Sequence, residues 1–322
     1  MKRRRTLELR GAVVVLTGAS SGIGRAAALA FAERGAKLVL AARDGKALEE
    51  VARECRDTYG VEAIAGPTDV RDELSVDALG GLAIEAFGKV DIWVNDAAVY
   101  MMGALEACPT HAIRELFETN VMGVLHGTRA ALACFRLNEN RGVLINIGSV
   151  AGKVSYADAG PYCASKHAVH AITEALRQEL VRTDIHACLI VPATVDTPLF
   201  QHSANYTGRE VLAMRPIYDA KRVARAIVRC AERPRREIRV GGAPALMTLM
   251  ARVVPWIYER VQPRMVERDH LGALGAGPTS GNFADPREPH RIDGGWRARR
   301  SPTKRVMNGV RTGALPILTS GG

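Results

Sequence analysis

The chain lacks the cysteine spacing of a zinc site or of a disulfide framework. None of its six cysteines forms a C-x-x-C pair, and most of them stand among apolar residues. Free buried thiols are typical of a reducing compartment, so we expect a cytoplasmic protein. The eight histidines are scattered. His167 and His170 are one helical turn apart but have no third ligand in view, so we predict no metal site.

Long apolar segments are absent as well. The basic N-terminus is followed by residues 11–18, which are typical of a strand, so we expect no signal peptide. The most apolar stretch, residues 243–257, is interrupted by Arg252 and Pro255. It is also shorter than the ~20 residues that a bilayer span needs. A helix that closes a cleft or packs at a subunit interface is the favoured interpretation. Membrane-surface contact through residues 243–260, helped by Trp256, is the alternative.

An excess of charge is missing from the body of the chain. The formal net charge is +10, but residues 1–10 carry five basic residues and one acidic residue, and residues 286–322 carry eight and two. The part between these ends therefore has no net charge, and a basic groove for nucleic acid is not indicated. Apolar residues make up 47% of the chain, which is typical of a globular protein with a sizeable core.

Apolar β-branched runs alternate with helical patterns up to about residue 240. This alternation predicts an α/β fold of the Rossmann type, in which one doubly wound parallel sheet carries helices on both faces. The predicted strands are 12–16, 37–41, 62–65, 90–95, 143–147, 187–191 and 237–240. Helices are predicted over 23–34, up to 59, over 71–87, from 110, from 161 and over 219–232.

A glycine-rich turn, Thr-Gly-Ala-Ser-Ser-Gly-Ile-Gly, joins the first predicted strand to the first helix. Glycines in such a strand–turn–helix context let the backbone approach a pyrophosphate, and the helix N-terminus supplies N–H groups for the anion. We predict that this turn binds a dinucleotide. Its candidate cofactor-binding residues are Gly18, Ser20, Ser21, Gly22, Ile23 and Gly24.

The end of the second predicted strand bears on the choice of dinucleotide. An acidic residue there would hold a ribose 2′-hydroxyl, whereas this strand runs into Arg43, which suits the 2′-phosphate of NADP. Asp44 is a competing candidate, but we expect it to cap the following helix. NADP(H) is therefore favoured, and NAD(H) remains the alternative.

Three polar residues are predicted to meet at the carboxyl edge of the sheet. Ser149 follows the strand 143–147, and Tyr162 and Lys166 are four residues apart at the start of the next helix. A nearby ammonium favours phenolate over phenol, so Lys166 is expected to lower the pKa of Tyr162. Tyr162 could then exchange a proton with a substrate oxygen that Ser149 holds by a hydrogen bond.

With these motifs in place, residues 10–245 resemble the short-chain dehydrogenase/reductase family in its Thr-Gly-x-x-x-Gly-x-Gly form. Four motifs occur in the family's order: Thr17–Gly24, Asn95–Ala98, Asn120, and Ser149 with Tyr162 and Lys166. The resemblance implies an NAD(P)-dependent oxidoreductase acting on CH–OH or C=O groups. It transfers a hydride between nicotinamide and a small-molecule carbonyl or secondary alcohol.

The resemblance also implies roles for single residues. Tyr162 is the general acid/base, and Lys166 lowers its pKa and binds the nicotinamide ribose. Ser149 positions the carbonyl, and Asn120 holds a water in a proton relay through Lys166. Contacts with the cofactor are implied for Asp69, Val70, Asn95, Ala97 and Thr197. The family commonly forms homo-oligomers through the helices that carry Asn120 and Tyr162.

Three departures from the family pattern concern the cofactor site. Ser21 stands where some NADP-using members of the family carry a second basic residue, so the choice of cofactor rests mainly on Arg43. Asp96-Ala97-Ala98 stands where the family usually has Asn-Ala-Gly, which affects the loop beside the adenosine but removes no catalytic group. Ala193 stands where a glycine is common, which makes the backbone beside the nicotinamide less certain.

We expect three regions along the chain. Residues 1–245 form the dinucleotide-binding and catalytic domain, in which the segment 192–217 suits a mobile lid. Residues 246–284 form an apolar helical extension, and residues 285–322 a basic tail rich in Gly, Pro, Ser and Arg that is expected to be disordered. The alternative function is a catalytically silent nucleotide-sensing or membrane-associated protein on the same fold.

Overall fold

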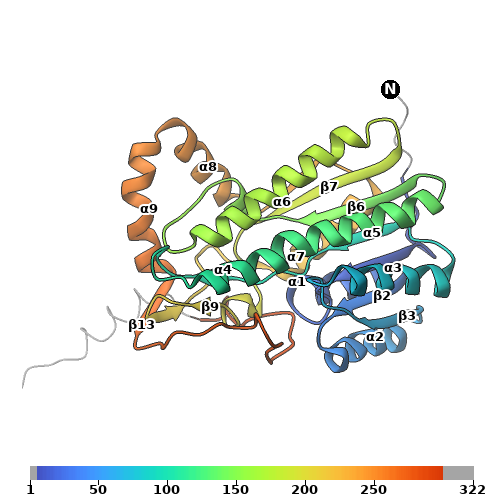
Figure 1. Cartoon of the computed structure of the whole chain (residues 1–322), viewed down its shortest axis with the longest axis horizontal. Coiled ribbons are helices and arrows are strands. Elements are labelled where there is room, and N and C mark those ends of the chain that lie inside the picture. The colour runs from blue at the N-terminus through green and yellow to red at the C-terminus, as the bar shows by residue number, and fades with distance from the viewer. Residues whose placement is uncertain (1–5, 300–322) are drawn as a thin grey trace, which may run out of the picture.

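A sheet of seven parallel strands forms the centre of the molecule (Figure 1). It is seen in a computed structural model that describes residues 6–299, apart from the side chains of residues 243–246. The order is β12-β7-β6-β4-β1-β2-β3, so the chain builds outwards in both directions from β1 and β4. In such sheets, ligands bind at the carboxyl ends of the strands where the order reverses. The strands are β1 (Val13–Thr17), β2 (Lys37–Ala42), β3 (Ala63–Pro67), β4 (Ile92–Asn95), β6 (Arg141–Ile147), β7 (Asp184–Pro192) and β12 (Glu237–Val240).

Helices cover both faces of this sheet, as predicted. One face packs its alternate residues, such as Val14 and Leu38, against α1 (Gly22–Ala32), α2 (Gly45–Tyr59) and α7 (Ala220–Glu232). The other face, with Val15 and Val39, packs against α3 (Glu73–Phe87), α5 (Gly123–Leu137) and α6 (Gly160–Glu179). Residues next to each other in a strand point to opposite faces, so a strand buried on both faces must be apolar throughout. Burying each such side chain is worth roughly 1.5–3 kcal/mol.

The helix boundaries follow from local chemistry. Asp44 caps α2, because its Oδ1 accepts the N–H of Ala47 at 3.0 Å, as the sequence predicted. Pro161 lies in the first turn of α6, also as predicted. The single helix predicted from Thr110 is interrupted. It divides into α4 (Thr110–Phe117), a π-helical turn (Glu118–Met122) and α5. Such π-turns are frequent at functional sites, and this one carries Asn120.

The region that we expected to be a lid contains short strands. Between β7 and α7 lie β8 (Val195–Asp196), a 3₁₀ turn (Pro198–Phe200), β9 (Ala204–Asn205), β10 (Arg209–Val211) and β11 (Tyr218–Asp219). Here β8 pairs with β11, β9 with β5 (Met101–Met102), and β10 with β13 (Leu271–Leu274). The last pairing ties this region to the C-terminal extension.

The extension itself contains α8 (Ala243–Val253) and α9 (Pro255–Asp269), which project from the body beside the start of α6 (Figure 1). The sequence predicted a disordered tail from residue 285, and for residues 285–299 this was wrong. Backbone and side-chain groups of this segment bond to Asp196, to Gly22 and to Asp44. These partners are distant in sequence, so local composition could not reveal them. Residues 300–322 lie outside the described part of the chain.

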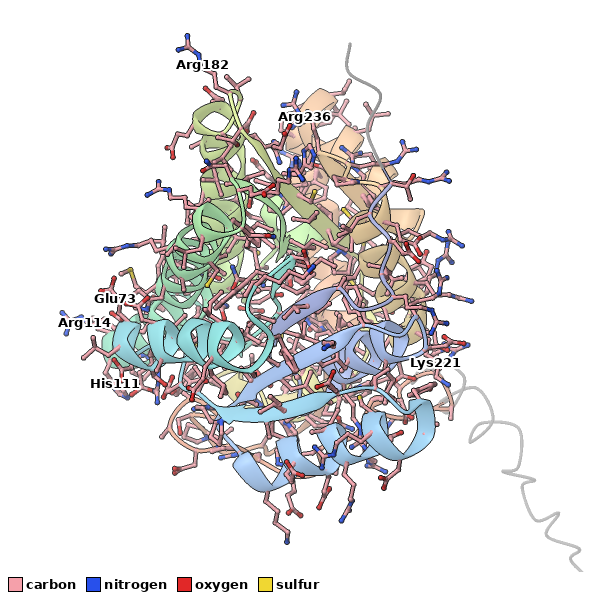
Figure 2. The ribbon with its side chains drawn as sticks, turned by 90° about the vertical axis from the view of Figure 1, so that its right-hand side faces the viewer. Glu73, His111, Arg114, Arg182, Lys221 and Arg236 are labelled. Atoms are coloured by element: carbon pink, nitrogen blue, oxygen red, sulfur yellow. The ribbon has the colours of Figure 1, made fainter. Side chains whose placement is uncertain are left out.

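Charged side chains of the helices and of the turns beside them point outwards, as Arg114 of α4 and Arg182 after α6 illustrate in Figure 2. All six cysteines are free and buried, which confirms the predicted buried thiols. Within residues 6–299, no helix is both long and apolar enough to cross a bilayer.

Candidate active site

A cleft of about 300 Å³ lies at the carboxyl edge of the sheet, where the strand order reverses. The glycine turn after β1 forms one wall with Gly18, Ser20, Ser21, Gly22 and Ile23. The ends of β2, β3 and β4 contribute Arg43, Asp69, Val70 and Ala97. The opposite wall holds Ser149, Tyr162, Lys166 and Thr197. The sequence predicted that these residues would come together, although they span most of the folded body.

Glycines in the turn leave no room for side chains. A Cβ on Gly18, whose φ is +72°, would lie 2.8 Å from the backbone N of Ala97. A Cβ on Gly24 would lie 2.2 Å from the carbonyl oxygen of Gly18. Gly24 therefore lets α1 pack against the turn, and it is not part of the cleft wall. The close backbone and the N-terminus of α1 fit the pyrophosphate of a dinucleotide.

Ser149, Tyr162 and Lys166 line one wall of the cleft. The Ser149 Oγ accepts the N–H of Ala151 at 3.1 Å, and the hydroxyl lies close enough to the Tyr162 phenol to affect its pKa. Lys166 Nζ donates to the carbonyl of Ile147 at 3.0 Å. Tyr162 and Lys166 are 6% and 4% exposed, so both polar groups sit in a largely desolvated place. This arrangement can hold a substrate oxygen between a serine hydroxyl and a phenol.

The electrostatics of Tyr162 differ from the sequence-based expectation. Burial raises the pKa of Tyr162, and the nearby Ser149 hydroxyl offsets this only in part. Burial also lowers the pKa of Lys166 to about 8. The expected lowering of the Tyr162 pKa by Lys166 was wrong for this structure, because desolvation dominates and the opposing contribution comes from Ser149. A phenol that stays protonated is a proton donor.

Asp96 is a further, half-buried ionisable group at this site. Its Oδ2 lies against Gly24, and the carboxylate is close enough to Lys166 for the two charges to stabilise each other. Burial raises the pKa of Asp96 to about 7. The sequence had marked Asp96 as a departure from the family pattern without assigning it a charge role. Its side chain adds a titratable group beside the glycine turn.

Two predicted site residues, Asn120 and Asn95, lie in the interior and not in the cleft wall. Asn120 is fully buried; its Oδ1 accepts the N–H of Val99 at 2.8 Å, and its Nδ2 donates to the carbonyl of Val99 and to Ser165 Oγ. Asn95 Nδ2 donates to Asn146 Oδ1 at 2.9 Å. Both side chains have protein partners, so they position neighbouring strands and helices. Direct contact between Asn95 and a cofactor, which the sequence predicted, does not fit this geometry.

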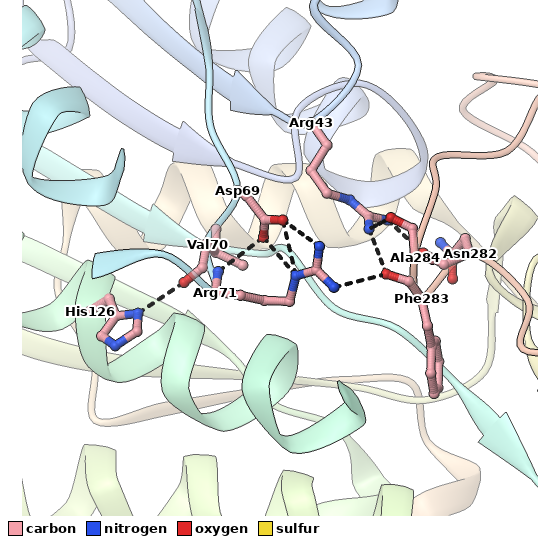
Figure 3. A network of polar contacts seen from close by, with 8 residues as sticks. All are labelled: Arg43, Asp69, Val70, Arg71, His126, Asn282, Phe283 and Ala284. Atoms are coloured by element: carbon pink, nitrogen blue, oxygen red, sulfur yellow. Dashed lines mark hydrogen bonds and ion pairs between the residues drawn. The ribbon is translucent and has the colours of Figure 1, made fainter. Parts of the chain in front are cut away.

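Two arginines lie near the ends of β2 and β3, Arg43 in the cleft wall and Arg71 beside Asp69 (Figure 3). Arg71 binds the carboxylate of Asp69, with Nη2 to Oδ2 at 2.5 Å and Nε to Oδ2 at 2.9 Å. Arg43 Nη1 donates to the carbonyls of Phe283 and Ala284, and the carbonyl of Val70 contacts His126 Nδ1 at 3.0 Å. Arg43 therefore faces the cleft as predicted, but its partners come from the C-terminal segment.

An aromatic cluster lines the other end of the cleft. The Tyr100 ring packs edge-on against Tyr162, with centroids 4.6 Å apart. His270 Nδ1 donates to the carbonyl of Leu212, because a carbonyl can only accept. Burial lowers the pKa of His270 to about 4, so its Nε2 accepts the Tyr100 hydroxyl at 2.6 Å. Tyr100 in turn accepts from Tyr156, 3.4 Å away.

The C-terminal extension closes this end, as one of the sequence interpretations proposed. Met247 of α8, Gln262 of α9 and His270 after α9 all line the cleft. Gln262 Oε1 accepts the N–H of Ala157 at 3.0 Å, which fixes the orientation of the amide. Leu199, Phe200 and Met214 complete a mostly apolar wall. The sequence could not assign these residues to the site, because only the tertiary fold brings them there.

A glycine turn at the switch point of a parallel sheet, facing a serine, a tyrosine and a lysine, defines a dinucleotide-dependent oxidoreductase. Comparison with known proteins agrees. The model of the short chain dehydrogenase family matches residues 12–207. The chain belongs to the short-chain dehydrogenase/reductase family, and it is an oxidoreductase of that family.

Relatives in sequence and structure support this assignment. The "Uncharacterized oxidoreductase YxnA" of Bacillus subtilis is 35% identical over 80% of this chain and 73% of its own length. A short chain dehydrogenase/reductase from Burkholderia phymatum in complex with NAD has a TM-score of 0.69 and 32% identity, covering 78% of this chain and 96% of its own. An alcohol dehydrogenase from Thermococcus sibiricus complexed with 5-hydroxy-NADP has a TM-score of 0.64 and 27% identity, covering 72% and 96%.

Proposed function

We propose that this protein reduces a neutral, apolar ketone or aldehyde with NADPH. The observation that carries the proposal is that Ser149, Tyr162 and Lys166 line the same cleft as the glycine turn. When bound, the reduced nicotinamide supplies the hydride. Ser149 holds the substrate oxygen, where negative charge develops, and Tyr162 donates the proton to it.

Lys166 and Asn120 have supporting roles in this chemistry. Lys166 would bind the nicotinamide ribose from the wall that also holds Tyr162. Asn120 bonds to Ser165, the residue before Lys166, so it positions the lysine's turn of α6. A water relay through Asn120 would have to use its backbone, since its side chain already has partners.

The preference for NADPH is supported by Arg43 at the end of β2. A guanidinium can bind the 2′-phosphate with two charge-assisted hydrogen bonds, and NAD has no such group. The relatives differ in this respect, because NAD was bound in one solved structure and NADP in another. The apolar wall with Phe200 and Met214 supports an apolar substrate.

Turnover across a panel of neutral carbonyl compounds tests the proposal, with NADPH or NADH as donor and the loss of reduced-nicotinamide absorbance as the readout. We expect turnover with NADPH, and a loss of roughly 10²- to 10⁴-fold in Tyr162→Phe with NADPH binding retained. Tyr258→Phe is the control, since this phenol donates to the carbonyl of Ser155 at 3.0 Å and is not part of the cleft wall. Full activity of Tyr162→Phe would refute the role.

We also propose a homo-oligomer that works in the cytoplasm. Exposed apolar residues on and beside the helices that carry Asn120 and Tyr162 support pairing there, namely Met122, Leu137 and Val181. The six free buried thiols support a reducing compartment. Sedimentation of the full chain tests the assembly, and a monomer at micromolar concentration would contradict it.

A further inference from the structure

The chain after β13 crosses the adenosine side of the cleft. We call residues 279–297 the strap. Its first residue, Thr279, exchanges backbone hydrogen bonds with Asn205, at 3.0 and 2.8 Å. Near its other end, the carboxylate of Asp196 accepts the N–H groups of Gly294 and Trp296, at 3.1 and 2.9 Å. Both ends are therefore fixed to the segment between β7 and α7, and the middle of the strap reaches across to the end of β2.

Three consecutive carbonyls of the strap converge on Arg43 (Figure 3). Arg43 Nη1 donates to Phe283 at 2.7 Å and to Ala284 at 2.9 Å, and Nη2 donates to Asn282 at 2.5 Å. Arg71 Nη1 donates to the same Phe283 carbonyl at 3.2 Å. The guanidinium thus meets three oxygens, the number that a phosphate group would offer it.

The strap also takes a backbone donor from the glycine turn. The N–H of Gly22, at the start of α1, donates to the carbonyl of Arg291 at 2.9 Å. The preceding residue of the strap is His290. Its Nε2 lies 2.9 Å from Asp44 Oδ2, and its backbone carbonyl accepts a hydrogen bond from Arg25 Nη1 at 2.8 Å. The strap therefore holds groups on both sides of the place where the adenosine ribose of a dinucleotide belongs in this fold.

We infer that the strap competes with the 2′-phosphate of NADP for Arg43, and that it thereby sets the discrimination between NADP and NAD. Three of the four terminal N–H groups of Arg43 already donate to strap carbonyls. A 2′-phosphate therefore has to displace these carbonyls before Nη1 and Nη2 can both bind it. NAD lacks this phosphate and leaves the Arg43 contacts intact. The inference rests on the proposed dinucleotide function.

Phe283 is the residue that holds these carbonyls in position. Its side chain is 1% exposed and packs in the cluster that contains Tyr100 and Tyr162. Truncating it removes this anchor without touching Arg43. If the strap occupies Arg43 in about nine molecules out of ten, the apparent Kd for NADP is about tenfold weaker than that of the open form. Phe283→Ala should restore most of this tenfold loss of affinity for NADP.

Calorimetry on the full chain with NADP and with NAD tests the inference. We expect Phe283→Ala to tighten NADP binding several-fold, by up to about tenfold, and to leave NAD binding unchanged. Phe135→Ala is the matched control, because this phenylalanine is equally buried against a different part of the core. If Phe283→Ala is poorly folded, His290→Ala, which frees the strap from Asp44, should shift the ratio of the two affinities in the same direction.

Hydrogen exchange of residues 282–291 in the wild-type chain provides a second readout. NADP should speed exchange of these amides, and NAD should not. Weaker NADP binding in Phe283→Ala, an equal change for both dinucleotides, or protection of the strap by NADP would each overturn the competition. If neither dinucleotide binds the wild-type chain, the proposed function fails, and the inference fails with it. If both bind without these differences, the strap inference alone fails.

Discussion

Replacing Asp96 by asparagine should stabilise the protein at high pH and not at low pH. The carboxyl is half-buried beside Gly24 and lies near Lys166, and its desolvation raises its pKa from 3.8 to about 7. One pKa unit corresponds to about 1.4 kcal/mol, so the native state disfavours the charged carboxylate by about 4 kcal/mol. The charge of Lys166 opposes this shift, and its attraction is already part of that balance.

The sign of the effect follows from proton binding. The native Asp96 holds its proton more tightly than the unfolded one, so its contribution to stability falls as pH rises from about 4 to about 7. An asparagine side chain has no such proton, and it keeps an oxygen beside Gly24. Between pH 5 and pH 8 the variant should therefore gain about 3 kcal/mol relative to the wild type.

Thermal unfolding at several pH values measures this difference. For a chain of this size, 1 kcal/mol corresponds to roughly 2–4 °C, so the Tm gap between variant and wild type should widen by several degrees from pH 5 to pH 8. Asp57→Asn, at an exposed position of α2, should show a constant gap. A gap for Asp96→Asn that is the same at both pH values would refute the reasoning.

Three other substitutions probe separate parts of the cleft. Arg43→Ala should weaken NADP binding about tenfold or more and change NAD binding little, because it removes charge-assisted bonds to the 2′-phosphate; equal losses for both dinucleotides would contradict this. Gly24→Ala should lower the Tm and abolish dinucleotide binding, because the new Cβ would lie 2.2 Å from the carbonyl oxygen of Gly18; normal binding measured by calorimetry would be inconsistent with it. His270→Phe should raise KM for the carbonyl substrate while the Kd for NADP stays constant, because it breaks the 2.6 Å hydrogen bond to Tyr100 in the substrate wall; a change confined to NADP binding would argue against this assignment.

The sheet could be predicted from the sequence because each strand and helix boundary is specified by residues that are close together in the chain. Buried parallel strands are continuous apolar runs, and the caps at Asp44 and Pro161 act over a few residues. The cleft followed from the topology, since parallel strands bring their carboxyl ends to one edge. Ser149, Tyr162 and Lys166 could thus be placed together before any coordinates were known.

What could not be predicted depends on long-range packing. The strap reaches Arg43 from about 240 positions away in the chain, and its contacts use backbone carbonyls, which any sequence provides. His270 and Gln262 enter the cleft because α9 folds over it. The direction of the Tyr162 pKa shift was wrong because pattern alone cannot weigh desolvation against a neighbouring charge.

The central claim is that Tyr162 donates a proton to a substrate oxygen while a hydride passes from bound nicotinamide to the adjacent carbon. Reduced NADP carrying deuterium at C4 of the nicotinamide tests this most directly, with mass spectrometry of the alcohol formed from an apolar ketone. We predict one deuterium at the former carbonyl carbon with the wild-type chain, and almost no product with Tyr162→Phe at saturating cofactor. Alcohol without deuterium, or labelled alcohol at the same rate from Tyr162→Phe, would contradict the account.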